Sequence, residues 1–296
     1  FPAFTRWAEW NGKYRDDMRS FLKGDYWFAE AAASRLTGSL DIYTDQYRGY
    51  NSSINFITCH DGFSLWDLYS YNGKHNEDNG WNNSDGSDDN RSWNCGEEGE
   101  TTDPQIRQLR LRMMKNACMV LMCSRGTPMF LAGDEFGDTR FGNNNPYCQD
   151  NEISWLDWKR LDTNRELYQF FKKMIWFRRE HPVIRSDQAP SETGFPTVSV
   201  HTDRPWERYI DQNTKALALC YAGKTDQGED LVYMALNVYW EEQKFELPKL
   251  PDTYEWRCFA DTALEEIGED ERKAAITEYR LHPRSAAVFV GVRRKQ

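Results

Sequence analysis

The sequence lacks an apolar run long enough to cross a bilayer, although 39% of its 296 residues are hydrophobic. It also lacks a surplus of positive charge, because 47 Asp and Glu residues outnumber 37 Lys and Arg residues and give a formal net charge of −10. Nucleic acid and anionic membrane surfaces are therefore not expected partners. No charged-then-apolar secretory leader is visible at the start.

Cysteine pairs with metal-binding spacing are also lacking. The seven cysteines are an odd number at irregular spacings, and none forms a Cys-x-x-Cys pair. Neither a zinc site nor a disulfide framework is indicated. We expect reduced thiols in a cytoplasmic protein.

One short stretch carries the clearest sign of chemistry. Residues 54–59 form an apolar run typical of a buried strand, and the run ends in His60-Asp61-Gly62. Parallel α/β folds place functional side chains at such strand ends, where the backbone is rigid and the next loop can cover a ligand. A structural alternative is that Asp61 caps the helix indicated by residues 64–68, with His60 as a packed neighbour.

Strand and helix patterns alternate in the first part of the chain. Residues 127–132 predict a second buried strand, and it also ends in a polar tip, residues 133–137. Asp103 and Pro104 suit the cap and first turn of a long helix. Successive strand–loop–helix units indicate a parallel sheet. Helices are predicted from Gly12 to Gly24, Phe28 to Gly38, Asp103 to Gly126, and Leu167 to Pro182.

Two polar loops follow the two strands, at residues 69–102 and 140–151. A loop as long as the first is usually functional or disordered, and its embedded Trp81, Arg91 and Trp93 argue against disorder. Its Asp and Asn residues do not fit the ligand spacing of an EF-hand, so no metal site is predicted.

From about Phe195 the pattern changes to short strands with turn residues between them, which indicates an antiparallel β-domain. The predicted strands are residues 198–201, 217–221, 231–239, 245–247, 254–259 and 286–292. We expect two domains, residues 1–183 and 184–296, joined by a linker over 184–196. The chain begins at Phe1 without an initiator Met, and we expect it to be cut from a longer chain.

Three segments together carry a family resemblance. They are Phe56-Ile57-Thr58-Cys59-His60-Asp61, then Gly133-Asp134-Glu135-Phe136-Gly137, then residues 142–155. In this order they resemble the α-amylase superfamily of glycoside hydrolases, and within it isoamylase and the bacterial glycogen debranching enzymes. Residues 7–16 and 88–96 are similar to the same group. The resemblance covers the chain from about Trp7 to Trp158, and the β-domain is much less diagnostic.

The resemblance implies a fold that is α/β plus all-β: the C-terminal part of a (β/α)8 TIM barrel, followed by an antiparallel β-sandwich. Active sites of TIM barrels lie at the C-terminal ends of the strands, in agreement with the two polar tips. It implies a branched α-glucan, such as glycogen or limit dextrin, as substrate. No cofactor is implied, since the reaction needs only carboxylates and water.

Retaining glycoside hydrolysis needs a nucleophile and a general acid/base, with their carboxyl groups about 5 Å apart. The residues alone nominate Asp61 and Glu135. The resemblance instead implies that both reactive carboxylates lie upstream of Trp7, and neither motif is present here. Asp61 then matches the third carboxylate, which stabilises the transition state, and His60 matches a histidine that binds the same glucosyl unit. Glu135 would anchor the barrel rim.

The two loops supply the expected substrate-binding residues. Amide and guanidinium groups suit sugar hydroxyls, and the face of an aromatic ring suits a sugar ring. An alternative is that Arg91 and the asparagines hold the loops together through backbone hydrogen bonds. The role of Trp81 at the branch side stays open. The expected residues are Asn90, Arg91 and Trp93 in the first loop, and Asn144, Asn145 and Tyr147 in the second.

The expected function is hydrolysis of α-1,6 branch linkages, with this chain inactive by itself. Two alternatives are a non-catalytic α-glucan-binding module and a transferase of the same superfamily. Part of a barrel leaves an open sheet edge with unpaired backbone groups. We therefore expect either self-association or a rearranged N-terminal stretch that covers this edge.

Overall fold

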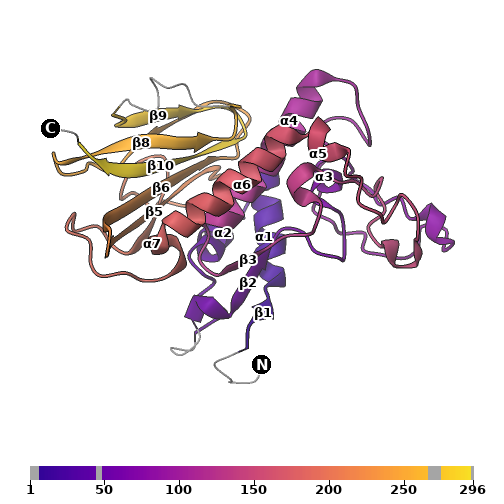
Figure 1. Cartoon of the computed structure of the whole chain (residues 1–296), viewed down its shortest axis with the longest axis horizontal. Helices are drawn as coiled ribbons and strands as arrows, with labels where there is room; N and C mark the ends of the chain where they lie inside the picture. Colours follow the sequence, from indigo (N-terminus) through magenta and orange to yellow (C-terminus); the bar gives the residue numbers. More distant parts are fainter. Residues whose placement is uncertain (1–6, 45–48, 266–274, 295–296) are drawn as a thin grey trace.

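A computed structural model describes residues 7–44, 49–265 and 275–294 (Figure 1). Helices α4 and α6 cross the middle of the molecule, between an antiparallel sheet on one side and long loops on the other. The first part of the chain contains β1 (Glu9–Trp10), α1 (Gly12–Lys23), α2 (Ala29–Leu36), β2 (Ser53–Phe56), α3 (Leu65–Leu68), α4 (Pro104–Cys123), β3 (Thr127–Met129), α5 (Arg160–Thr163), α6 (Arg165–Glu180) and α7 (Pro182–Arg185).

The described strands of the first part form a parallel sheet in the order β1-β2-β3. Short 3-10 turns η1 (Gly49–Ser52), η2 (Glu77–Asn79), η3 (Asp134–Phe136) and η4 (Pro146–Cys148) lie in the connections. The predicted parallel sheet is therefore confirmed. Its strand β1 was not predicted, because two residues are too few to show a strand period.

Both predicted buried strands are shorter than expected. β2 ends at Phe56 and β3 at Met129, although Ile57, Thr58 and Cys59 remain buried. Beyond the ends of these strands, hydrogen bonds with side chains take the place of pairing with a neighbouring strand. For example, Nε of Arg19 donates to the carbonyl of Ile57 at 2.8 Å.

Local signals explain where the helices begin and end. The side chain of Asn11 accepts from the backbone N–H of Tyr14 at 2.9 Å, and Gly24 ends α1 with φ of 89°. Asp103 caps α4 by accepting from the N–H of Gln105 at 2.7 Å, as predicted. α4 ends at Cys123, before the predicted Gly126.

The suggestion that Asp61 caps the next helix is wrong. Ser64 caps α3, because its hydroxyl accepts from the N–H of Asp67 at 3.3 Å. Asp61 therefore has no capping role at α3.

The second part forms an antiparallel β structure, as predicted. A five-stranded sheet has the order β4-β5-β6-β10-β8, and β7 pairs with β9 in a second sheet. The strands are β4 (Val198–His201), β5 (Ala216–Thr225), β6 (Gly228–Asn237), β7 (Gln243–Glu246), β8 (Tyr254–Asp261), β9 (Glu278–Leu281) and β10 (Ser285–Arg293). β9 was missed because two of its four residues are charged.

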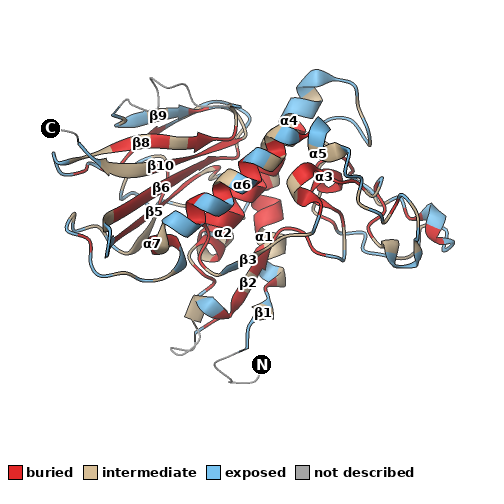
Figure 2. Ribbon diagram, viewed as in Figure 1, coloured by how far each residue is buried: buried red, intermediate tan, exposed pale blue. Residues whose placement is uncertain are grey.

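The core is continuous between the two parts. Buried side chains from α1 and α4 pack with Leu217 and Tyr221 of β5, and Figure 2 shows buried residues on the facing surfaces. The Tyr221 hydroxyl donates to the carbonyl of Cys123 at the end of α4, at 2.8 Å. A second cluster, with Tyr233 and Phe289, fills the space between the two antiparallel sheets. No described helix is long and apolar enough to span a membrane.

Candidate functional site

His60 and Asp61 follow β2 and lie side by side at the surface. Nε2 of His60 is 3.4 Å from Oδ1 of Asp61, and 67% and 76% of the two side chains are exposed. A neutral imidazole can donate and accept hydrogen bonds with a polyol, and an ionised carboxylate can accept them. The pair is therefore available to a ligand.

Aromatic and basic residues of neighbouring segments support the pair. The ring of Trp10, on β1, meets the His60 ring edge-on at 5.6 Å between centroids. Arg140 donates from Nη1 to the His60 carbonyl at 3.2 Å, and the Gly62 N–H donates to the Asn144 carbonyl at 3.0 Å. Strand β1 thus contacts the His60 side chain, while the loop 140–151 holds the backbone at His60 and Gly62.

A buried carboxylate lies beneath the strand ends. Asp134 is 1% exposed and accepts hydrogen bonds from the N–H groups of Leu65 at 2.8 Å and Leu131 at 3.1 Å, and from the hydroxyl of Thr58. Burial raises its pKa to about 6. Asp134 joins the segment after β2 to the segment after β3, so it positions the backbone that carries His60.

Asp67 of α3 is a second buried carboxylate that joins two segments of the chain. It accepts from the N–H of Arg140 at 2.8 Å and from the hydroxyl of Thr139, and burial raises its pKa to about 6. Sequence reasoning placed Asp134 in the polar tip after the second strand, but it gave neither Asp134 nor Asp67 a role. The spacing of Ser64 and Asp67 indicated a helix cap, and the glycine before Asp134 indicated a turn, but neither pattern indicated the distant partners of these carboxylates.

Glu135 forms a hydrogen bond within its own turn. Its Oε2 accepts from the N–H of Gly133 at 2.9 Å. This contact fits the expected anchoring of the rim and gives no support to Glu135 as a reactive carboxylate.

The asparagines of the two long loops form a buried hydrogen-bond network. Nδ2 of Asn144 donates to Oδ1 of Asn90 and to the Ser87 carbonyl, each at 2.8 Å, and Oδ1 of Asn144 accepts from Nδ2 of Asn76 at 2.8 Å. Asn90 and Asn144 are 3% and 2% exposed. Their amides are occupied by protein partners, which favours the loop-holding alternative for these two residues.

Arg91 and Trp93 also face the protein. Nη1 of Arg91 donates to the Asp16 carbonyl at 3.0 Å and to the Ser20 hydroxyl at 3.2 Å, both on α1. The guanidinium of Arg284, which precedes β10, lies over the Trp93 ring at 4.4 Å. These contacts fix the first loop to the helical and β parts.

Asn145, Tyr147 and Trp81 lie nearer the solvent. Nδ2 of Asn145 donates to Asp85 at 2.9 Å. The exposed Trp81 donates from Nε1 to the hydroxyl of the exposed Tyr147 at 3.0 Å, so the tips of the two loops present two linked aromatic rings. Of the six loop residues predicted to bind substrate, Tyr147 is the one that is largely exposed, at 68%.

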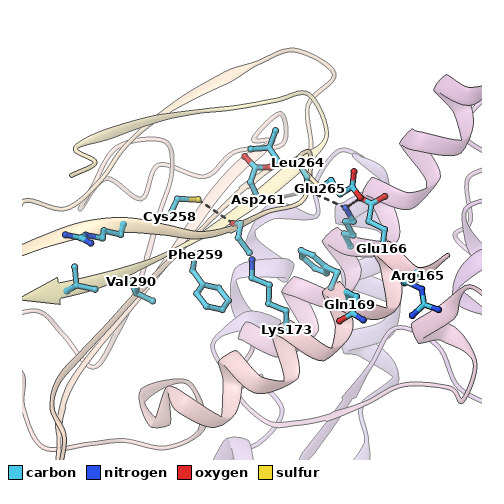
Figure 3. Close-up of a pocket in the computed structure, with 15 residues that line it drawn as sticks. Arg165, Glu166, Gln169, Lys173, Cys258, Phe259, Asp261, Leu264, Glu265 and Val290 are labelled. Carbon is cyan, nitrogen blue, oxygen red and sulfur yellow. Dashed lines mark hydrogen bonds and ion pairs between the residues drawn. The ribbon is translucent and has the colours of Figure 1, made fainter. Parts of the chain in front are cut away.

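A cavity of about 620 Å³ lies elsewhere, between α6 and β8 (Figure 3). Lys115 and Glu166 form an ion pair in it, and Phe259 and Leu264 supply apolar surface. It contains none of the predicted site residues. In the described ranges, no group of three or more His, Cys, Asp or Glu side chains could hold a metal ion.

Known proteins similar to this chain share its sequence over most of its length. Isoamylase 3, chloroplastic, from Oryza sativa subsp. japonica is 44% identical over 266 residues, which are 90% of this chain and 33% of that protein. The glycogen operon protein GlgX homolog from Mycobacterium tuberculosis H37Rv is 42% identical over 281 residues, 88% of this chain and 39% of that protein. The predicted resemblance to the isoamylase group of the α-amylase superfamily is therefore confirmed. No protein-family model matches the chain.

Solved structures agree with this assignment at the level of fold. The pullulanase from Bacillus acidopullulyticus has a TM-score of 0.65 at 18% identity, covering 96% of this chain and 30% of that one. A pullulanase from Paenibacillus barengoltzii, complexed with maltohexaose and alpha-cyclodextrin, has a TM-score of 0.63 at 20% identity, with coverages of 97% and 39%. The chain thus spans between 30% and 39% of the length of these four proteins.

Proposed function

We propose that this chain is part of a debranching enzyme that hydrolyses α-1,6 linkages in glycogen or a related α-glucan. One observation carries the proposal: the chain is 42–44% identical to an isoamylase and to GlgX homologs over about 90% of its length. The exposed His60-Asp61 pair at the end of a parallel strand lies where such chemistry would be placed.

The incomplete sheet supports a larger barrel. Strands β1 and β3 each pair with β2, and in the described residues neither has a partner on its outer side. We propose that β1, β2 and β3 are the last strands of a (β/α)8 barrel, completed by strands outside these 296 residues. The antiparallel part would then be the family's C-terminal β-sandwich.

Asp61 is proposed to stabilise the transition state. As the glycosidic bond breaks, positive charge develops on the sugar ring, and a carboxylate beside that ring lowers the energy of the oxocarbenium-like state more than that of the bound substrate. His60, 3.4 Å away, would hold a hydroxyl of the same glucosyl unit. Neither residue has to accept or deliver the proton of the leaving group.

The nucleophile and the acid/base are proposed to come from outside these residues. Within them, Asp67 and Asp134 are buried in structural hydrogen bonds, and Glu135 binds its own turn. None of these three carboxylates is therefore available to react with a sugar ring bound beside Asp61. Asn90, Arg91, Trp93 and Asn144 are proposed to shape the loops, while Asn145 and Tyr147 remain the residues proposed to meet the glucan.

The test is a debranching assay on a branched α-glucan. The chain would be assayed by itself and after joining to the upstream segment of its native gene, with reducing-end release as the readout. We expect activity only in the joined form. Reducing ends released by the pure chain alone would overturn the proposed division of the site.

The same assay distinguishes the alternatives. Chain-length analysis of the products separates hydrolysis, which shortens chains, from transfer, which lengthens some of them. Inactivity of both forms would favour a glucan-binding module.

A further inference from the structure

A second place on the molecule combines exposed aromatic rings with neutral polar groups. A cavity of about 420 Å³ lies where the turn after α1 meets the β part. Tyr26 and Trp240 are 55% and 56% exposed, so both residues are accessible to a ligand. The residues that line it include Tyr26, Asn213, Lys215, Tyr239, Trp240 and Gln243.

The aromatic walls are held in fixed positions. The rings of Tyr239 and Trp240 lie 4.1 Å apart between centroids with 33° between their planes. Nζ of Lys215 lies 4.0 Å from the centre of the Tyr26 ring and donates to the carbonyls of Gly24 and Asp25, at 2.8 and 2.9 Å. The turn that carries Tyr26 is thereby tied to the β part.

Backbone strain at the same turn supports a purpose beyond packing. Trp27 has φ of 75°, a conformation that a bulky side chain rarely adopts, and 73% of the residue is exposed. Its N–H donates to the Gln212 carbonyl at 3.0 Å, which holds the strained turn against the loop before β5. The turn thus places two adjacent exposed aromatic residues, Tyr26 and Trp27, beside the β part.

The chemistry of the cavity selects a neutral polyol. No carboxylate lines it, and the ammonium of Lys215 already has two carbonyl partners. The side-chain amides of Asn213 and Gln243 make no hydrogen bond within the described residues, so both can serve sugar hydroxyls. Aromatic faces beside free amides are the combination that a sugar ring needs, with its C–H faces and hydroxyl edge.

Helix α1 relates this cavity to the His60-Asp61 pair. Trp10, just before α1, contacts the His60 ring, whereas Gly24, just after α1, contacts Lys215. The 12 residues of α1 rise about 18 Å. The two places therefore lie at opposite ends of α1, about the length of one helix apart.

We propose that Tyr26, Tyr239 and Trp240, with Asn213 and Gln243, form an auxiliary site that binds a linear segment of α-glucan. This inference rests on the proposed function, since it takes the polymer as the substrate. The site would hold one chain of a branched polymer while another chain occupies the space beside Asp61. It would raise the local concentration of branch points without taking part in bond cleavage.

The test measures glucan binding by the 296-residue chain, with no need for activity. Maltoheptaose is titrated by calorimetry, and glycogen is included in native gels to retard the protein. Trp240→Ala removes a ring face, Trp240→Phe keeps a smaller one, and Trp176→Ala removes a Trp of similar exposure, 50%, from α6. Cellohexaose serves as the β-linked control.

We expect Trp240→Ala to bind maltoheptaose about tenfold more weakly or worse, a loss of about 1.4 kcal/mol. Trp240→Phe should lose less, Trp176→Ala should match the parent chain, and cellohexaose should bind poorly. Asp61→Asn should still be retarded by glycogen. Equal binding by Trp240→Ala and the parent, or no retardation of the parent chain, would overturn the inference.

The debranching assay keeps the two proposals apart. If the joined protein debranches and Trp240→Ala leaves binding unchanged, the auxiliary site is wrong and the proposed function stands. If Trp240→Ala abolishes binding and the joined protein does not debranch, the glucan site stands and the hydrolase proposal fails.

Discussion

Asp61 presents its carboxylate to solvent, with 76% of its side chain exposed. Replacing it by Asn removes charge and hardly changes packing. In the chain joined to its upstream segment, we expect Asp61→Asn to lower kcat by at least about 100-fold, because the lost interaction is made chiefly in the transition state. Steady-state kinetics on a branched oligosaccharide measure this.

The matched control is Asp226→Asn, at the exposed turn between β5 and β6, which should leave kcat unchanged. Both variants should melt within a few degrees of the parent. Turnover near the parental value in Asp61→Asn would remove the role proposed for this carboxylate.

His201 is a buried residue whose charge state affects stability. Its Nδ1 accepts from the N–H of Trp206 at 2.7 Å, so the ring proton resides on Nε2, which lies 2.9 Å from the Ser199 hydroxyl. Burial lowers the His201 pKa from 6.5 to about 4. A second proton would turn the Nδ1 acceptor into a donor that faces an N–H.

The unfolded chain therefore takes up this proton at higher pH than the folded one. As the pH falls from 6.5 to 4, we expect His201 to reduce the free energy of unfolding by up to about 3 kcal/mol. His201→Asn keeps an acceptor for the Trp206 N–H but does not titrate. Urea unfolding at several pH values should show the parent losing stability relative to this variant as the pH falls.

Comparison with the variant is necessary because two carboxyls act in the opposite direction. The pKa values of Asp67 and Asp134 are raised to about 6, so these groups bind protons more readily in the folded state, and their effect on stability becomes more favourable as the pH falls from 6 towards 3.8. A stability difference between parent and His201→Asn that does not change with pH would contradict the prediction for His201.

Residue types indicated which side chains can bind sugar, but their direction depends on the whole fold. Asn90 and Tyr147 were equally reasonable sugar ligands from sequence. The structure buries the first among other asparagines and exposes the second. Such a difference arises from how two loops meet, and no pattern within either loop reveals it.

At the scale of elements, Arg178 of α6 stabilises the end of α4. Its Nη1 donates to the carbonyls of Met122 and Ser124, at 2.7 and 2.8 Å, and its Nη2 to that of Gly126, at 2.6 Å. A cation is favourable at the C-terminal end of a helix, where carbonyls lack partners. The single side chain thus supports both the helix end and the turn into β3.

We expect Arg178→Ala to cost about 3 kcal/mol or more, because it leaves buried carbonyls without donors. Arg178→Lys should cost less, since it keeps the charge but cannot reach all three acceptors. Arg179→Ala, on the exposed side of α6, is the control and should cost little. Denaturant unfolding measures all three, and similar values for positions 178 and 179 would show that the network is unimportant.

Long, periodic elements could be predicted from the sequence, and short ones could not. Helices α1 and α4 carry their caps, Asn11 and Asp103, next to a clear apolar period. β1 is two residues long, and its pairing with β2 is decided by tertiary contacts. The ends of β2 and β3 were placed too late, because burial continues after strand pairing has stopped.

At the scale of the whole molecule, the two outer strands of the parallel sheet, β1 and β3, are each paired on one side only within the described residues. The outer backbone groups of β1 and β3 have no strand partner in the described part of the chain. We expect concentration-dependent self-association of the isolated chain in sedimentation velocity, and rapid hydrogen exchange at these strands when the chain is dilute. A clean monomer with strongly protected amides in β1 and β3 would contradict this.

The continuous core has a consequence for recombination between relatives. Hydrogen bonds join the two parts across the boundary predicted near residue 183, such as those of Tyr221 with Cys123 and of Lys215 with Gly24. The β part therefore packs against the helices and shares a hydrophobic core with them. A chimera that takes the two parts from different parents would inherit mismatched halves of one interior, so a viable crossover would have to carry α1, α4 and β5 together from the same parent.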